Sequence, residues 1–304
     1  VDEQHRFGVR QRLALRLKGG YPHQLMMSAT PIPRTLSMSY YADLDVSVID
    51  ELPPGRTPVT TKLVSESRRD EVIARVRDAC MSGRQAYWVC PLIEETPASP
   101  MKGKKTAEVL SLKAVLETYE AVKRTFPDLR VGLIHGRLSA QDKAAAMERF
   151  GAGDIQLLVA TTVIEVGVDV PNASLMVIEH AERMGLAQMH QLRGRVGRGA
   201  AASVCILLYS SPLSETARER LKIVFENSDG FEIARHDLRL RGPGELLGAR
   251  QSGQPMLRFA DIAADAELVE ATRDLAETLL QSHPEAARRH LARWLANWQE
   301  YLKA

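Results

Sequence analysis

Two carboxylates and an imidazole stand together near the start of the chain, as Asp2, Glu3 and His5. At the end of a strand, Asp2 can hold Mg²⁺ and Glu3 can orient a water molecule for attack on a phosphate. Asp-Glu-Gln-His is nevertheless a common tetrapeptide, and a solvated chain end is the simpler interpretation of it alone. The catalytic interpretation therefore depends on the rest of the sequence.

A second candidate, Ser28-Ala-Thr30, places two hydroxyls after the apolar residues 24–28. These residues favour a buried strand, and Thr30 followed by Pro31 is typical of a helix start. Thr30 can therefore be a helix N-cap with no further role. It can also connect a nucleotide site to another ligand, if the other elements support such a site.

Residues 191–198 read Gln-Leu-Arg-Gly-Arg-Val-Gly-Arg. If they are helical, Gln191, Arg195 and Arg198 share one face, and the glycines between them allow close approach. Two planar, always-charged guanidiniums suit a polyphosphate and can stabilise the charge that develops during phosphoryl transfer. The alternative is a basic last helical turn before a capping Gly199. That alternative explains the sign of the charges but not the glutamine or the internal glycines.

Residues 160–172 predict a strand followed by a polar turn that contains glycine. Thr161 and Thr162 can contact a nucleic-acid backbone through hydroxyls and main-chain amides. Gly167 and Asp169 can reach a nucleotide. An ordinary strand-to-helix loop is the alternative for this stretch.

Elements that alternate along the chain must position these residues. Short apolar runs predict strands at 86–90, 131–134, 155–160, 175–178 and 204–208. Helical periodicity precedes the first of them, at 72–80, and separates later ones, at 112–122 and 139–150. Strands separated by helices indicate an α/β domain with a parallel sheet and helices on both faces.

The chain of 304 residues is long enough for about two domains. Prolines and a glycine between 53 and 58 indicate a linker and a first boundary. The strands should stop near Ser211. An arginine- and glycine-rich segment at 235–258 follows, then an amphipathic helix at 268–279 and a helical tail at 284–304.

Composition excludes several classes of protein. The net charge is only +2, so any affinity for nucleic acid must come from local basic patches. Three cysteines without a Cys-x-x-Cys pair favour reduced thiols in a cytoplasm over a zinc site or a disulfide framework. No apolar run approaches the ~18 residues that a membrane span needs, and the charged opening at Asp2 and Glu3 does not resemble a signal peptide.

Together, in this order and spacing, the four elements resemble the later motifs of superfamily 2 helicases. The resemblance is closest to the RecG family of bacterial branched-DNA helicases, and it rests on residues 2–8, 28–35, 42–58, 134–138 and 237–253. The last of these segments resembles a translocation motif shared with Mfd, a transcription-repair translocase. His5 and the stretch from Asp43 to Pro58 favour RecG over Mfd.

The resemblance implies RecA-like domains and a division into three parts: residues 1–54 as the end of a first RecA-like domain with a linker, 55–212 as a complete second one, and 213–304 as a translocation motif with C-terminal helices. It also implies ATP and Mg²⁺ as cofactors. Its partners would be branched double-stranded DNA at forks and Holliday junctions, together with single-stranded DNA-binding protein. The protein would be a monomer in the bacterial cytoplasm, associated with the nucleoid.

The same resemblance implies roles for single residues. Asp2 would bind Mg²⁺ and Glu3 would activate water, while Gly167 and Asp169 would contact the nucleotide. The ATP site would be completed by Gln191, Arg195 and Arg198. Nucleic-acid contact or coupling would fall to His5, Ser28, Thr30, Thr161, Thr162, Arg220, Arg241 and Gln251. For the arginine-rich loop, bridging of neighbouring carboxylates is the alternative role.

A phosphate-binding loop of the form Gly-x4-Gly-Lys-Ser/Thr is missing from the 304 residues. RecG-like proteins carry this loop upstream of the first motif. We therefore expect a C-terminal fragment that does not hydrolyse ATP alone. An Mfd-like translocase and a non-hydrolysing DNA-binding or protein-interaction module remain as alternatives.

Overall fold

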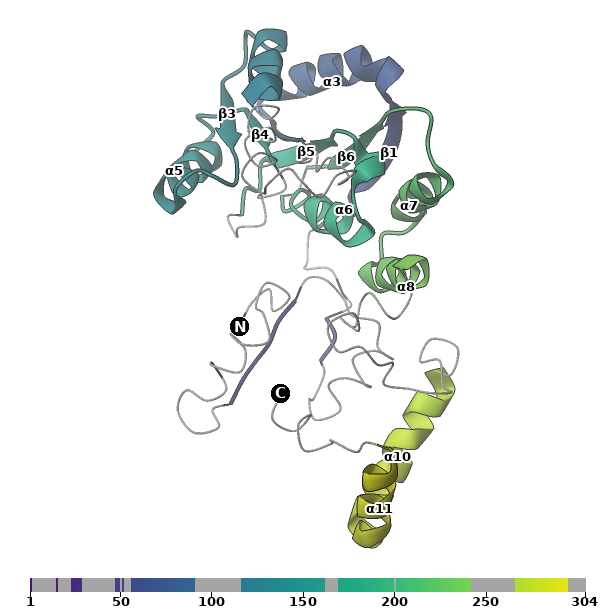
Figure 1. Ribbon diagram of the computed structural model, residues 1–304. Coiled ribbons are helices and arrows are strands. Elements are labelled where there is room, and N and C mark those ends of the chain that lie inside the picture. Colours follow the sequence, from purple (N-terminus) through teal and green to yellow (C-terminus); the bar gives the residue numbers. More distant parts are fainter. Residues whose placement is uncertain are drawn as a thin grey trace, which may run out of the picture. The chain divides into compact units, whose positions relative to one another are not determined.

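The computed structural model in Figure 1 describes residues 1, 15, 23–28, 47–49, 51, 56–90, 116–161, 169–199, 201–241 and 266–294. The chain divides into two compact units. One is residues 50–233, and the other combines residues 1–49 with 234–304. Neither unit tests the three-part division expected above, which stays a prediction.

A six-stranded parallel sheet forms the centre of the 50–233 unit, in the order β1-β6-β5-β2-β4-β3. The strands are β1 (Thr60–Ser65), β2 (Gln85–Val89), β3 (Val131–Ile134), β4 (Leu157–Ala160), β5 (Ala173–Ile178) and β6 (Val204–Tyr209). The expected parallel α/β domain is confirmed, and all five predicted strands are present within two residues at each end. β1 was not predicted, because this edge strand is only partly buried and its sequence, Thr-Thr-Lys-Leu-Val-Ser, has few apolar residues.

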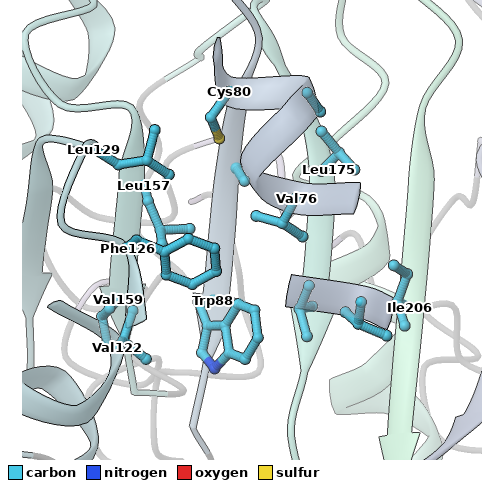
Figure 2. Packing of buried hydrophobic residues seen from close by; sticks show 14 of the residues in the cluster. Val76, Cys80, Trp88, Val122, Phe126, Leu129, Leu157, Val159, Leu175 and Ile206 are labelled. Atoms are coloured by element: carbon cyan, nitrogen blue, oxygen red, sulfur yellow. The ribbon is translucent and has the colours of Figure 1, made fainter. Parts of the chain in front are cut away.

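One face of the sheet packs around Trp88 (Figure 2). Helix α3 (Arg69–Met81) and the helical residues 116–125 cover this face. The buried residues of α3 are Val72, Val76, Ala79 and Cys80, as the helical spacing predicts. The Phe126 ring meets Trp88 edge-on, with the centroids 5.9 Å apart. Burial of such large side chains contributes roughly 1.5–3 kcal/mol each to the stability of the fold.

The opposite face is covered by α5 (Ala140–Gly151), α6 (Leu186–Arg193) and α7 (Glu215–Glu226) (Figure 1). Phe150 of α5 contacts Tyr87 of β2, with ring centroids 4.9 Å apart. Helices on both faces are therefore confirmed. α5 begins as expected, because the Ser139 hydroxyl accepts a hydrogen bond from the Asp142 amide at 3.1 Å and caps the helix.

Further helices follow the last strand, so the strands of the described residues stop where the sequence predicts. α8 (Gly230–Arg241) crosses the boundary between the two units. In the second unit, α10 (Ala266–Ser282) packs on α11 (Pro284–Trp294). α10 contains the predicted helix 268–279, and α11 begins at the predicted residue. The predicted continuation from 295 to 304 lies outside the described residues.

The expected buried strand at 24–28 was wrong. No strand is assigned to residues 23–28, and the Leu25 side chain is 73% exposed. Within the described residues the segment pairs with Val1, whose ammonium donates to the Leu25 carbonyl at 2.7 Å and whose carbonyl accepts from the Met27 amide at 2.8 Å. Two such hydrogen bonds do not make a ladder.

The three cysteines, Cys80, Cys90 and Cys205, are buried and free. None of the helices in the described ranges is both long and apolar enough to cross a bilayer.

Candidate functional site

The predicted arginines stand in a turn, not on a helix. α6 ends at Arg193, and Gly194 caps it by donating its amide to the His190 and Leu192 carbonyls. Gly197 has a φ of +80°, a left-handed conformation that continues no helix. Residues 191–198 therefore do not form one helix, and the shared face that Gln191, Arg195 and Arg198 would have on a helix is not present. Gln191 stays in the last turn of α6, and residues 194–198, hereafter the arginine turn, follow it.

The arginine turn pairs with the loop after β4. The Arg198 Nη1 lies 3.6 Å from the Asp169 Oδ1. The Arg198 side chain is 28% exposed and the Asp169 side chain 60% exposed, so both reach solvent at the same place. The structure thus brings together two residues that the sequence placed in separate motifs.

The charged side chains of this site shift the pKa of the Tyr87 hydroxyl. Burial raises that pKa to about 12, Arg195 and Arg198 lower it, and Asp169 raises it. All three charged groups therefore act on one buried side chain of β2. Two guanidiniums and one carboxylate at this edge leave a net positive charge, which suits an anionic ligand such as a polyphosphate.

The remaining arginine of the motif, Arg193, turns into the protein, where it is 5% exposed. Its guanidinium donates to the carbonyls of Val224 (3.1 Å), Asn227 (2.8 Å) and Ser228 (3.0 Å) at the C-terminal end of α7. It also lies 2.9 Å from His190 Nδ1. Arg193 therefore ties α6 to the end of α7. Nothing in the sequence indicated that Arg193 is buried whereas Arg198 reaches solvent.

Burial lowers the pKa of His190 to about 4, and the positive charge of Arg193 makes a smaller contribution in the same direction. The imidazole is therefore neutral at pH 7 and accepts the hydrogen bond from Arg193 at Nδ1. The pKa of Arg193 is itself lowered, mainly by burial. This pair is structural, since both side chains are directed into the protein beside the end of α7.

Thr161 and Arg220 also point inward. Thr161 is 1% exposed, and its hydroxyl has no hydrogen-bond partner among the described residues. Arg220 on α7 donates from Nη2 to the Glu182 carbonyl at 2.9 Å, beside the short helix η3 (Ala181–Arg183). Neither side chain has the exposed position that direct DNA contact requires. A coupling role for Arg220 stays a prediction.

The other predicted residues are placed as follows. Ser28 is exposed. Arg241 is the last residue of α8, and its side chain is not among those described. Asp2, Glu3, His5, Thr30, Thr162, Gly167 and Gln251 lie outside the described residues. The ranges that are described contain no cluster of three or more side chains of the kind that bind metal ions.

Comparison with known proteins identifies this arrangement. Residues 89–200 match the helicase conserved C-terminal domain, and residues 227–302 match the C-terminal part of domain 3 of the ATP-dependent DNA helicase RecG. The chain is 55% identical to the ATP-dependent DNA helicase RecG of Escherichia coli O127:H6 over 309 aligned residues. The chain belongs to the RecG family.

Other RecG proteins are similarly close. RecG of Acidithiobacillus ferridurans is 56% identical over 99% of this chain. A structure of RecG bound to a three-way DNA junction superposes with a TM-score of 0.65 and 45% identity, over 88% of this chain and 33% of that chain. The resemblance noted from the sequence is confirmed, with the chain corresponding to a C-terminal portion of RecG. The chain spans 43% of the Escherichia coli protein and 42% of the Acidithiobacillus protein.

Proposed function

We propose that this chain is the C-terminal motor half of an ATP-dependent double-stranded DNA translocase that remodels stalled forks and Holliday junctions. The observation that carries the proposal is the pairing of Arg198 with Asp169 beside Arg195 at one exposed edge of the RecA-like domain. Branched DNA is the proposed substrate because the RecG structure similar to this chain is bound to a three-way junction.

In this proposal the arginine turn binds the triphosphate of ATP. Arg195 and Arg198 neutralise charge that accumulates on the phosphate oxygens during hydrolysis. Gln191, in the last turn of α6, completes the ATP site beside them. Asp169 holds Arg198 near the site before a phosphate replaces the carboxylate as its partner. Gly167 contributes main-chain contact to the nucleotide.

The proposal assigns Mg²⁺ to Asp2 and activation of the attacking water to Glu3. These two assignments rest on the sequence motif alone. Since the 304 residues hold no phosphate-binding loop, we expect the chain by itself to hydrolyse no ATP. A second part of the intact protein would supply the loop.

For coupling to DNA, we assign His5 and Thr30 to relaying the nucleotide state, and Ser28 and Thr162 to nucleic-acid contact. The buried Thr161 is assigned to coupling, because its side chain does not reach solvent. Arg220, Arg241 and Gln251 belong to the translocation motif, in which an arginine-rich segment gives local positive charge for DNA phosphates. The proposal includes the division into residues 1–54, 55–212 and 213–304. It also includes a monomer, contact with single-stranded DNA-binding protein, and a cytoplasmic, nucleoid-associated location.

The test is ATP-dependent strand separation by the full-length protein on two labelled substrates of equal length, a three-way junction and a linear duplex. We expect unwinding of the junction at a rate at least ~10-fold above that of the duplex, because a branch-specific motor gains binding energy only at a junction. Equal action on both substrates would favour an Mfd-like translocase. Binding without ATP-dependent unwinding would favour a non-hydrolysing DNA-binding module.

A further inference from the structure

An arginine that belongs to none of the motifs bridges the arginine turn. Arg56 lies in segment 56–59, which leads directly into β1. Its Nε donates to the Gly197 carbonyl at 3.0 Å, and its Nη2 to the Gly194 carbonyl at 3.3 Å. These carbonyls stand on either side of Arg195 and Val196. One guanidinium therefore fixes both ends of the turn that carries the two candidate phosphate-binding arginines.

The same segment also fixes the turn by packing. A Cβ atom added to Gly197 would lie 2.8 Å from Val59 Cγ2, so the backbone of the turn runs directly against Val59. Beyond the turn, a Cβ at Gly199 would collide with the Pro171 carbonyl oxygen, two residues after Asp169. The turn is thus confined between segment 56–59 and Pro171, with Arg198 at its end.

This arrangement matters more for geometry than for stability. The arginine turn leaves the C-terminal end of α6, where carbonyls lack helical partners and Arg56 satisfies two of the carbonyls nearby. A hydrogen bond at an exposed site adds little to the stability of a fold. A catalytic side chain must be held within about 0.5 Å of its productive position, and a 1 Å misplacement costs on the order of 10²-fold in rate.

We propose that Arg56 is a positioning residue for ATP hydrolysis, holding Arg195 and Arg198 in place through the Gly194 and Gly197 carbonyls. The inference rests on the proposed function, because it assigns the reaction in which the arginine turn acts. Arg56 does not touch the nucleotide in this account. Its effect therefore appears in kcat and in the mobility of the turn, not in binding of DNA.

The chain offers a matched control. Arg130 makes the same kind of bridge at another edge of the sheet, with Nε donating to the Asp154 carbonyl at 2.7 Å and Nη2 to the Gly153 carbonyl at 3.1 Å. It lies just before β3, the edge strand at the opposite end of the sheet from β1. Arg130→Ala should cost similar local stability without reaching the arginine turn.

The experiment measures ATP hydrolysis by the full-length protein with forked DNA. Arg56→Ala should lower kcat at least ~10-fold with KM for ATP within about threefold, because misplacing a group that acts in the transition state lowers kcat. Arg56→Lys should recover little, since one ammonium cannot bridge both carbonyls. Arg130→Ala should stay within about twofold of the wild-type protein. A kcat for Arg56→Ala equal to that of Arg130→Ala, or full recovery by Arg56→Lys, would overturn the inference.

Amide hydrogen exchange of the same full-length variants separates this inference from the proposed function. Arg56→Ala should speed exchange in residues 194–199, and Arg130→Ala should speed it only near residues 153–156. Unchanged exchange in 194–199 would overturn the positioning role whatever the kinetics. Suppose instead that exchange in 194–199 is faster in Arg56→Ala but the wild-type protein hydrolyses no ATP. Arg56 would then still hold the arginine turn in place, and only the proposed function would be contradicted.

Discussion

Arg198 Nη1 lies 3.6 Å from Asp169 Oδ1, although the two residues come from different loops of the RecA-like domain. The separation is longer than a good hydrogen bond, and the Asp169 side chain is 60% exposed. An exposed pair of this kind contributes at most about 1 kcal/mol to stability. Arg198 can therefore exchange its carboxylate partner for a phosphate at little cost, as the proposed ATP site requires.

Replacing Arg198 with alanine in the full-length protein should reduce ATP turnover by at least ~10³-fold, because the guanidinium would no longer neutralise the transferred phosphoryl group. Steady-state hydrolysis with forked DNA measures this loss. Arg77→Ala is the control, since Arg77 is a partly exposed arginine that pairs with Asp128 away from the arginine turn. Near-normal turnover of Arg198→Ala would contradict the assignment of the arginine turn to the ATP site.

Gly197→Ala should disturb the turn, because a side chain there is strained at a φ of +80° and would meet Val59 at 2.8 Å. We expect a loss of roughly 1–3 kcal/mol in stability, as strained left-handed positions show, with lower kcat. Gly151→Ala is the matched control: it lies at the end of α5 with nothing within 4 Å of the added Cβ. Thermal unfolding of both variants gives the comparison, and equal melting temperatures would contradict the geometry described.

Arg193→Ala should destabilise the chain by about 3 kcal/mol or more, because the carbonyls of Val224, Asn227 and Ser228 would lose a charged donor at a buried site. Arg130→Ala should cost less than about 1 kcal/mol, since water can replace its exposed guanidinium. Urea unfolding measures both. Equal losses in the two variants would show that burial of Arg193 does not matter.

His190 should make the chain less stable in mild acid. Its pKa is lowered from 6.5 to about 4 in the folded chain, chiefly by burial, so below pH 6.5 the unfolded chain takes up a proton that the folded chain does not. The contribution of the neutral imidazole is complete above pH 6.5 and is lost as the pH falls toward 4, at about 1.4 kcal/mol per pH unit.

The measurement is urea unfolding at pH 7.5 and pH 5.0. His190→Asn, which keeps an acceptor for Arg193, should lose about 2 kcal/mol less than the wild-type chain between these values. The remaining titratable groups are common to both proteins and cancel in the comparison. An identical pH dependence would mean that His190 titrates normally in the fold.

Some elements of the fold could be predicted from the sequence and others could not. Strands β2, β4, β5 and β6 were predictable because they are almost wholly buried and read as largely apolar runs. The edge strand β3 is only partly buried but still reads as a short apolar run, Val-Gly-Leu-Ile. The edge strand β1 was not predictable, since half-exposed residues give no such run. The i, i+4, i+7 spacing of Gln191, Arg195 and Arg198 is compatible with one helical face, but it does not show that the helix ends at Arg193.

The residues of the candidate site could be predicted from the sequence, but the contacts that hold them in place could not. Asp169 and Arg198 could be named from their motifs, whereas their pairing depends on where two loops meet. Arg193 and Arg195 are the same residue type two positions apart, and only the end of α7 decides that one turns inward. Arg56 follows Pro-Pro-Gly in a segment that predicts a linker, and its bond to Gly197 spans 141 positions of sequence.

The most direct test of the motor account is steady-state ATP hydrolysis by this chain and by the full-length protein, each with and without forked DNA. We expect fork-stimulated turnover by the full-length protein and none by this chain, because the 304 residues complete the ATP site with arginines but hold no phosphate-binding loop. Absence of hydrolysis by the full-length protein under both conditions would contradict the account.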